Sequence, residues 1–188
     1  MGNRLSRITT RTGDQGQTGL GDGRRLSKAD LRIHCLGEVD ELNSWIGLLR
    51  AELPNQDELQ AVLNQIQHDL FDMGGELAVP GFNAFNPRAL TELETAQEQL
   101  AHNLPALKEF VLPAGNRQTA QAHLARTVCR RAERHLVELA AVEEINPLLL
   151  AYLNRLSDTL FIMARGLARR DGGQEVLWQN RYTHTSPV

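Results

Sequence analysis

The chain has 188 residues, 41% hydrophobic and 23% charged, which is enough for one hydrophobic core and short for two domains. We therefore expect a single domain over residues 1–188. The formal net charge of −3 gives no global basic field, which excludes extended nucleic-acid binding and leaves only local anion sites. Aromatic residues make up only 5%, a composition that favours helices over a β-sandwich.

The first distinctive segment, about residues 9–28, is rich in glycine and threonine. It has no apolar periodicity, so we expect a long loop at the start of the domain. Glycines allow backbone N–H groups to converge on phosphate oxygens, and the segment also carries hydroxyl donors and the point charge of Lys28. The loop is a candidate phosphate cradle, although it matches neither a Walker A loop nor a Rossmann turn. A flexible terminal arm is an equal alternative.

Five helices are expected after this loop, over about residues 30–171. Their predicted bounds are Asp30–Leu53, Gln56–Leu77, Pro87–Leu104, Asn116–Val142 and Asn146–Asp171. An apolar connector, Phe110–Gly115, precedes the fourth helix. The chain after Asp171 is expected to be weakly structured, with a flexible tail at residues 181–188.

The last two helices carry the clearest apolar pattern, with steps that alternate between three and four residues. The stripes are Ala122, Ala125, Cys129, Ala132, Leu136 and Leu139 on one, and Leu149, Leu153, Leu156, Leu160, Met163 and Leu167 on the other. This 3.5-residue period is typical of near-parallel packing. The sequence therefore predicts an all-α, five-helix up-and-down bundle.

A polar stripe lies one residue from the apolar stripe on each of these helices. On the fourth helix Arg126, Arg130 and Glu133 fall within about 60° of one another. On the fifth helix the same shift selects Asn154, Asp158, Phe161 and Arg165. Between Arg117 and Glu138 there are five arginines and two glutamates, which indicates a local site for a multiply charged anion such as a triphosphate.

The alternative interpretation is that Arg126, Arg130 and Glu133 form salt bridges along a solvated helix face, as most such runs do. The matched stripe on the fifth helix favours a cleft instead. The six histidines lie at unrelated spacings, so no metal site is predicted, and His123 and His135 are assigned to packing or hydrogen bonding. No serine or cysteine has a recognisable catalytic spacing, which indicates chemistry by positioning and electrostatics.

The remaining features concern cysteines and membranes. Cys35 and Cys129 belong to no Cys-x-x-Cys pair, which gives no support for a disulfide framework or a zinc site. Both are expected to be small buried residues in a reducing compartment. No apolar run reaches the roughly 20 residues that span a bilayer, and we expect a cytoplasmic protein without a membrane partner.

Several of these segments together resemble one family. They are Thr10–Asp14, Val39–Ser44, Ala125–Arg134 and Asn154–Asp158. In this order, from about Thr9 to Trp178, they are similar to the ATP:cob(I)alamin adenosyltransferases of the propanediol-utilisation type. The resemblance implies a homotrimer of five-helix bundles, with ATP at each subunit interface and the corrinoid beside it.

The resemblance also implies roles for individual residues. The residues that would wrap the triphosphate are Thr10, Arg11, Thr12, Gly13, Thr18 and Lys28, with Mg²⁺ accompanying it. The residues that would bind the nucleotide are Arg130, Arg131, Glu133, Arg134 and Asn154. Arg126 would pair with Asp40 of a neighbouring subunit, Asp158 would support the site, and Phe110 would lie under the corrin ring.

In the implied reaction, cobalt(I) attacks the 5′ carbon of ATP and expels triphosphate, giving adenosylcobalamin. An apolar wedge such as Phe110 would displace the lower axial ligand of the corrinoid and ease its reduction to cobalt(I). A reductase and an adenosylcobalamin-dependent acceptor enzyme are the implied further partners. The chain departs from the usual pattern at Ala114, where a second glycine is common, and beyond Trp178, where no motif is recognised. The competing hypothesis is a non-catalytic helical module that binds a nucleotide for regulation or assembly.

Overall fold

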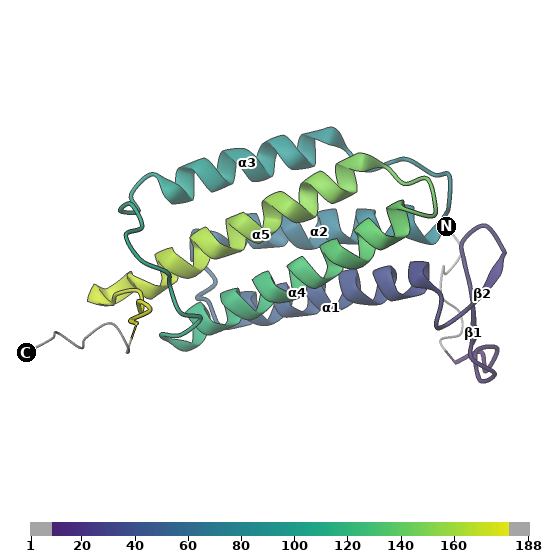
Figure 1. Ribbon diagram of the computed structural model, residues 1–188, viewed down its shortest axis with the longest axis horizontal. Coiled ribbons are helices and arrows are strands. Elements are labelled where there is room, and N and C mark those ends of the chain that lie inside the picture. Colours follow the sequence, from purple (N-terminus) through teal and green to yellow (C-terminus); the bar gives the residue numbers. More distant parts are fainter. Residues whose placement is uncertain (1–8, 181–188) are drawn as a thin grey trace, which may run out of the picture.

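Five helices, each antiparallel to the one before it in the chain, dominate the computed structural model, which describes residues 9–180 (Figure 1). They are α1 (Leu31–Ala51), α2 (Leu59–Ala78), α3 (Pro87–Ala101), α4 (Arg117–Ala140) and α5 (Pro147–Ala168). The predicted all-α, five-helix bundle is confirmed. Residues 1–8 and the tail predicted to be flexible, residues 181–188, lie outside the described part.

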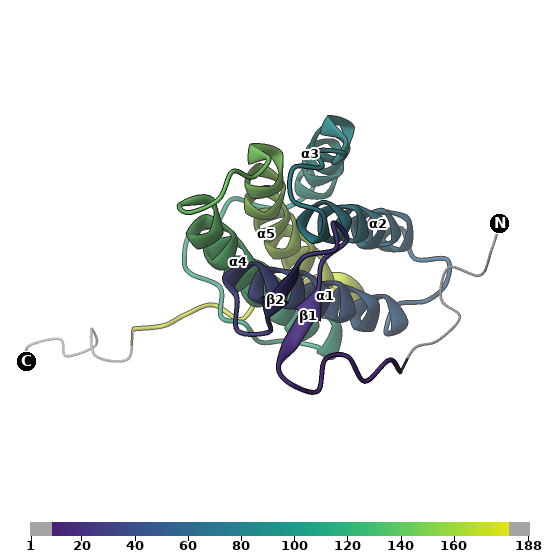
Figure 2. The ribbon, with the colours of Figure 1, turned by 90° about the vertical axis from the view of Figure 1, so that its right-hand side faces the viewer.

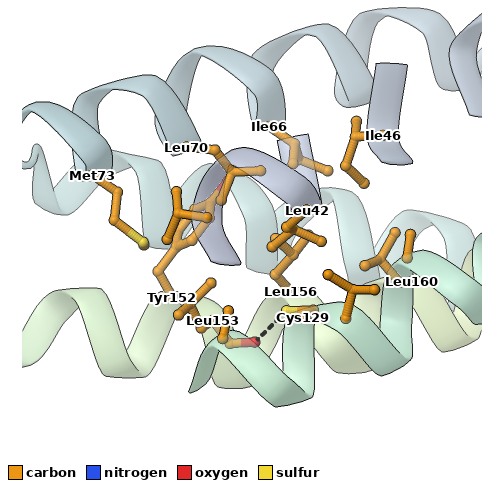
Figure 3. Packing of buried hydrophobic residues seen from close by; sticks show 14 of the residues in the cluster. Leu42, Ile46, Ile66, Leu70, Met73, Cys129, Tyr152, Leu153, Leu156 and Leu160 are labelled. Atoms are coloured by element: carbon orange, nitrogen blue, oxygen red, sulfur yellow. Dashed lines mark hydrogen bonds between the residues drawn. The ribbon is translucent and has the colours of Figure 1, made fainter. Parts of the chain in front are cut away.

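The helices form a closed ring when the molecule is viewed along the bundle (Figure 2). α4 packs between α1 and α5, α3 packs on α5, and α2 packs on α1 and touches α3. Every member of the two apolar stripes on α4 and α5 is buried. Leu42 and Ile46 of α1 and Ile66 and Leu70 of α2 face them across the core (Figure 3). The 3.5-residue period therefore predicted the core of this half of the bundle correctly.

Four helices end earlier than predicted, α1 and α4 by two residues and α3 and α5 by three. α3 stops at Ala101 instead of Leu104, because the ring of Pro105 would clash with the carbonyl of the residue four positions before it. α5 stops at Ala168 instead of Asp171 and continues as a short 3₁₀ turn, Arg170–Gly172. Asp171 has a φ of 53°, a left-handed conformation that ends the helix.

The N-terminal segment is not the structureless loop that we predicted. It contains an antiparallel hairpin of β1 (Gln17–Gly19) and β2 (Arg25–Ser27), in which Thr18 pairs with Leu26. The Gly-Asp-Gly turn between the strands places Gly23 at a φ of 87°, which favours glycine. The hairpin is attached to the bundle by a hydrogen bond of 2.7 Å from the Gly21 N–H to the Ala78 carbonyl.

The prediction for the chain after Asp171 was also wrong. Leu177 forms a β-bridge with Val111 of the connector, and the Trp178 N–H donates to the Phe110 carbonyl at 2.7 Å. Glu175 is held by Arg165 and Arg169. Residues 175–178 thus fold back onto the connector instead of leaving the bundle.

Both cysteines are free and buried, as expected. The Cys129 thiol donates to the Leu153 carbonyl at 3.2 Å, and burial raises its pKa far above the usual range. Such a thiol is not a nucleophile at neutral pH. None of the helices between residues 9 and 180 is long and apolar enough to cross a membrane.

Candidate functional site

The candidate residues lie at two ends of the bundle. The hairpin lies where α1 begins and α4 ends, whereas the connector before α4 lies at the other end, together with residues 175–178 (Figure 1). Arg126 is 14 residues before the end of α4, or about 21 Å along the helix axis. Within residues 9–180 no hydrogen bond or ion pair joins the hairpin segment to the polar stripe of α4.

Backbone hydrogen bonds fix the shape of the glycine-rich loop. The Gly16 N–H donates to the Gly13 carbonyl at 3.1 Å, and the Lys28 N–H donates to the Gly16 carbonyl at 2.8 Å. The Arg25 guanidinium donates to the Thr12 carbonyl at 2.6 Å. The segment is therefore ordered by its own contacts, which favours a preformed cradle over a flexible arm.

The cationic and hydroxyl groups of this loop are grouped and open to solvent. A Cβ built on Gly13 would lie 3.1 Å from the Lys28 ammonium nitrogen, so the absence of a side chain lets Lys28 approach the backbone there. The hydroxyls of Thr10 and Thr12 lie 2.9 Å apart. Among the described carboxylates, none forms an ion pair with Arg11 or Lys28, which leaves both charges available to an anion.

The polar stripes of α4 and α5 meet as the sequence predicted. The Asn154 amide donates to the Glu133 carboxylate at 2.9 Å, which joins the two helices beside their apolar seam. Arg126, Arg130 and Glu133 form no ion pairs with one another in the described structure, so the salt-bridged alternative is not what the chain adopts. The Arg130 side chain is exposed and has no carboxylate partner among residues 9–180.

Arg126 lies in a different environment from Arg130. Its guanidinium carbon is 5.9 Å from the centre of the Phe161 ring, and its Nε is buried and has no hydrogen-bond partner within residues 9–180. Burial and the nearby charge of Arg130 lower its pKa. A buried, unpartnered donor is costly, so this position is suited to an acceptor that a single chain does not supply.

His123 lies beside Arg126 in the same interior. Its ring is 6.1 Å from Phe161, and neither ring nitrogen has a hydrogen-bond partner. Burial and then the charge of Arg126 lower its pKa, so the neutral form is favoured. His123 therefore packs as predicted, without the hydrogen bonds of an ordinary buried histidine.

An open hollow of about 490 Å³ lies at the connector end. It is lined by residues 107–111, at the start of the connector and just before it, together with Arg126 and Phe161. Phe110 is 80% exposed, and its ring meets that of Trp178 edge-on at 6.5 Å. An exposed phenylalanine beside a hollow is an apolar surface that a flat ligand would cover.

The other predicted residues are dispersed. Arg131 forms ion pairs with Glu38 at 2.5 Å and with Glu41, and the hydrogen bond to Glu38 raises its pKa. It therefore joins α4 to α1. Arg134 donates to the Arg130 carbonyl at 3.1 Å. Asp40 is exposed on α1 and Asp158 is exposed on α5.

The predicted stripe on α5 is divided by the structure. Asn154 and Phe161 join the site, but Arg165 is turned toward the Pro105 carbonyl and Glu175 and has a structural role. Trp178 was not a candidate from the sequence. The signal for it was a second short apolar run, Val176–Trp178, which matches Phe110–Leu112 in length and pairs with it.

No group of three or more histidine, cysteine or acidic side chains within residues 9–180 could hold a metal ion. Arg11 and Lys28 on the loop and Arg126 and Arg130 on α4 are cations, and the carboxylate of Glu133 beside them is joined to the Asn154 amide. The described chain is therefore suited to binding anions and not to building a metal cage of its own.

The chain was compared with known proteins. A family model described as cobalamin adenosyltransferase matches residues 8–167. A cobalamin adenosyltransferase from Cupriavidus metallidurans is 57% identical over 182 residues, which cover 95% of this chain and 97% of the relative. A corrinoid adenosyltransferase from Bacillus subtilis is 44% identical over 179 residues and 92% of each chain.

Solved structures agree with these relatives. A phenylalanine-to-alanine variant of the PduO-type ATP:corrinoid adenosyltransferase from Lactobacillus reuteri, complexed with cobalamin and ATP, superposes with a TM-score of 0.87. It is 36% identical, and the match covers 93% of this chain and 100% of that one. An arginine-to-lysine variant of the same enzyme, complexed with ATP, gives a TM-score of 0.85 at 38% identity over 92% of this chain and 100% of that one.

Proposed function

The chain belongs to the cobalamin adenosyltransferase family, and from this premise we propose how its two half-sites carry out the reaction. It transfers the 5′-deoxyadenosyl group of ATP to the cobalt of cob(I)alamin. A cobalt–carbon bond forms with the electron pair of cobalt(I), the bond from the 5′ carbon to oxygen breaks, and triphosphate leaves with the electron pair of that carbon–oxygen bond. No nucleophile from the protein is needed, in agreement with the inert Cys129 thiol.

The glycine-rich loop holds the triphosphate in this proposal. Backbone groups around Gly13 and the hydroxyls of Thr10, Thr12 and Thr18 donate to phosphate oxygens. Arg11 and Lys28 stabilise the charge that develops as triphosphate departs. The support is that both cations are exposed and free of carboxylate partners within residues 9–180, on a loop that is already ordered.

The polar stripe of α4 and α5 binds the rest of the nucleotide. Arg130 supplies charge, and Glu133 and Asn154, already joined at 2.9 Å, present oxygen and amide groups to the nucleoside. We assign Arg131 and Arg134 to the same surface, with Arg131 oriented by Glu38 and Glu41. Asp158, exposed one turn after Asn154, supports this face from α5.

The corrinoid lies at the connector end. Phe110 and the hollow beside it provide an apolar surface for the lower face of the corrin ring. Phe110 displaces the lower axial ligand, which makes the cobalt easier to reduce. A reductase that supplies the electron and an acceptor enzyme that takes the product are the partners that this chemistry requires.

We propose that the complete site forms between subunits of a homotrimer. The loop and residues 107–111, which line the hollow, lie toward opposite ends of one bundle, so a single chain would separate ATP from the corrinoid. The buried Nε of Arg126 lacks an acceptor, and Asp40 of a neighbouring subunit would supply one. Leu48 of α1 and Leu124 of α4 are 41% and 45% exposed. Their apolar surface suits a contact between subunits.

Magnesium and the cellular location complete the proposal. The described residues form no cluster of metal ligands, so Mg²⁺ would depend on the phosphate oxygens of ATP, as is usual for this ion. When bound it would neutralise part of the triphosphate charge. Free, buried Cys35 and Cys129 suit a reducing compartment, which supports the cytoplasm.

The observation that carries the site assignment is the α4–α5 polar junction beside the Phe110 hollow. A module that only binds nucleotide has no use for that hollow, and the similar proteins are transferases by name. The test is to incubate the protein with ATP, Mg²⁺ and chemically reduced cobalamin. We expect adenosylcobalamin and triphosphate in equal amounts, and product no higher than in a protein-free control would contradict the assignment.

A further inference from the structure

Residues 175–178 are anchored to the end of the bundle by a buried ion pair. The Glu175 carboxylate accepts from Arg165 Nε at 3.0 Å and also pairs with Arg169. The Arg165 and Glu175 side chains are 9% and 7% exposed. Burial alone would raise the pKa of Glu175, but hydrogen bonds from Arg169, from its own backbone and from Arg165 lower it, so the carboxylate stays charged.

This anchor places the next residues along the connector. The Leu112 N–H donates to the Val176 carbonyl at 2.8 Å, and the Trp178 N–H donates to the Phe110 carbonyl at 2.7 Å. The two bonds flank the Val111–Leu177 bridge. Because they act on either side of Val111, they fix the backbone from which the Phe110 side chain projects.

The Trp178 side chain adds a contact to the Phe110 ring itself. The ring centres are 6.5 Å apart at an interplanar angle of 78°, an edge-to-face arrangement. Within residues 9–180 this is the ring contact recorded for Phe110, whose side chain is 80% exposed. Such a side chain otherwise loses its rotamer freedom only when the ligand arrives, which weakens binding.

We propose that Glu175 and Trp178 are positioning residues for the corrinoid half of the reaction: they hold Phe110 in the orientation that meets the corrin ring before the corrinoid binds. The inference rests on the proposed role of Phe110. Neither residue touches the reacting atoms. Glu175 acts on the backbone of the connector, and Trp178 acts on the Phe110 ring.

The test compares Trp178→Ala with wild type, with Trp178→Phe as the conservative variant. With ATP bound, the absorbance spectrum of added cob(II)alamin reports the fraction that has lost its lower ligand. We expect the ratio of cob(II)alamin without its lower ligand to cob(II)alamin with it to fall by up to about tenfold in Trp178→Ala. A change of this size corresponds to the free energy of one aromatic contact. Trp178→Phe should restore most of it, and the reaction with pre-reduced cob(I)alamin should stay within about twofold of wild type.

Two further variants keep the outcome decisive. Glu175→Gln, which weakens the anchor without removing an aromatic ring, should shift the spectrum in the same direction. Phe71→Ala is the matched control, because Phe71 is 74% exposed on α2, away from the hollow. A Trp178→Ala spectrum like that of wild type, or equal losses with cob(II)alamin and cob(I)alamin, would overturn the inference. A wild-type protein inactive even with cob(I)alamin would instead overturn the proposed function.

Discussion

The two ends of this bundle are built on different physical principles. The hairpin end is polar, rich in glycine and held by backbone hydrogen bonds, with unpaired Arg11 and Lys28 open to solvent. The connector end is apolar, with an exposed Phe110, an adjoining hollow and a buried Arg165–Glu175 pair behind it. One end suits a polyphosphate and the other a large flat ring.

The separation of the two ends bears on how the subunits assemble. α4 runs between the two ends, so its length separates the two proposed binding sites within one chain. Transfer of the adenosyl group requires their reacting atoms to meet, which two chains can achieve when the loop of one lies over α4 of the next. The comparison also predicts that the hairpin end acts through charge and is weakened by salt, whereas the connector end is not.

The largest expected effect lies on the polar stripe of α4, which runs between the two ends. Arg130→Ala should lower kcat/KM for ATP by about 10²–10³-fold, because a cation that binds the nucleotide and has no carboxylate partner within residues 9–180 is lost. Steady-state kinetics with pre-reduced cobalamin measures it. Arg117→Ala is the matched control, since Arg117 is a highly exposed arginine of the same helix that pairs with Glu52. Similar losses in the two variants would mean that general charge, not Arg130, is responsible.

A smaller and more selective effect is expected at the connector end. Phe110→Ala should react with cob(I)alamin within a few-fold of wild type and fail mainly when cob(II)alamin must be reduced on the protein, because only reduction needs the lower ligand displaced. Paired assays with the two cobalt states measure this ratio. Equal impairment in both assays would show that Phe110 serves binding in general, and the contrast between the ends would be lost.

The smallest expected effect is on stability, and it concerns His123. Its pKa is lowered by burial and by Arg126, so the folded state holds it neutral while the unfolded chain takes up a proton below about pH 6.5. The free energy of unfolding should therefore fall as the pH drops below that value. In His123→Leu the free energy of unfolding should fall less between pH 7.5 and 5.5, by about 1 kcal/mol or less. Urea unfolding at the two pH values measures this difference. An unchanged pH dependence would place the titrating group elsewhere.

Local periodicity explains what the sequence could predict. The core of α4 and α5 follows from apolar residues at helical spacing, and a shift of one residue correctly located Glu133 beside Asn154. The ends of α3 and α5 were misplaced by only three residues each, because turn geometry and not the pattern decides them.

The features that could not be predicted from the sequence depend on contacts between residues that are distant along the chain. The strands of the hairpin have three residues each, too few for an alternating pattern to be visible. Arg131 finds Glu38 across 93 positions of sequence. The pairing of residues 110–112 with 176–178 is equally remote, and without it Trp178 has no evident connection to the site.

The central claim, that the hairpin loop of one chain and α4 of another form one site, is tested by mixing defects. Lys28→Ala and Arg130→Ala chains should each be nearly inactive alone. Coexpressed, they should recover activity at about one site in four, because some interfaces pair an intact loop with an intact α4. Coexpression of Lys28→Ala with Thr12→Ala, two defects in the same loop, is the control and should recover none. If the Lys28→Ala and Arg130→Ala mixture is no more active than the sum of its parts, each chain carries its own site and the account is contradicted.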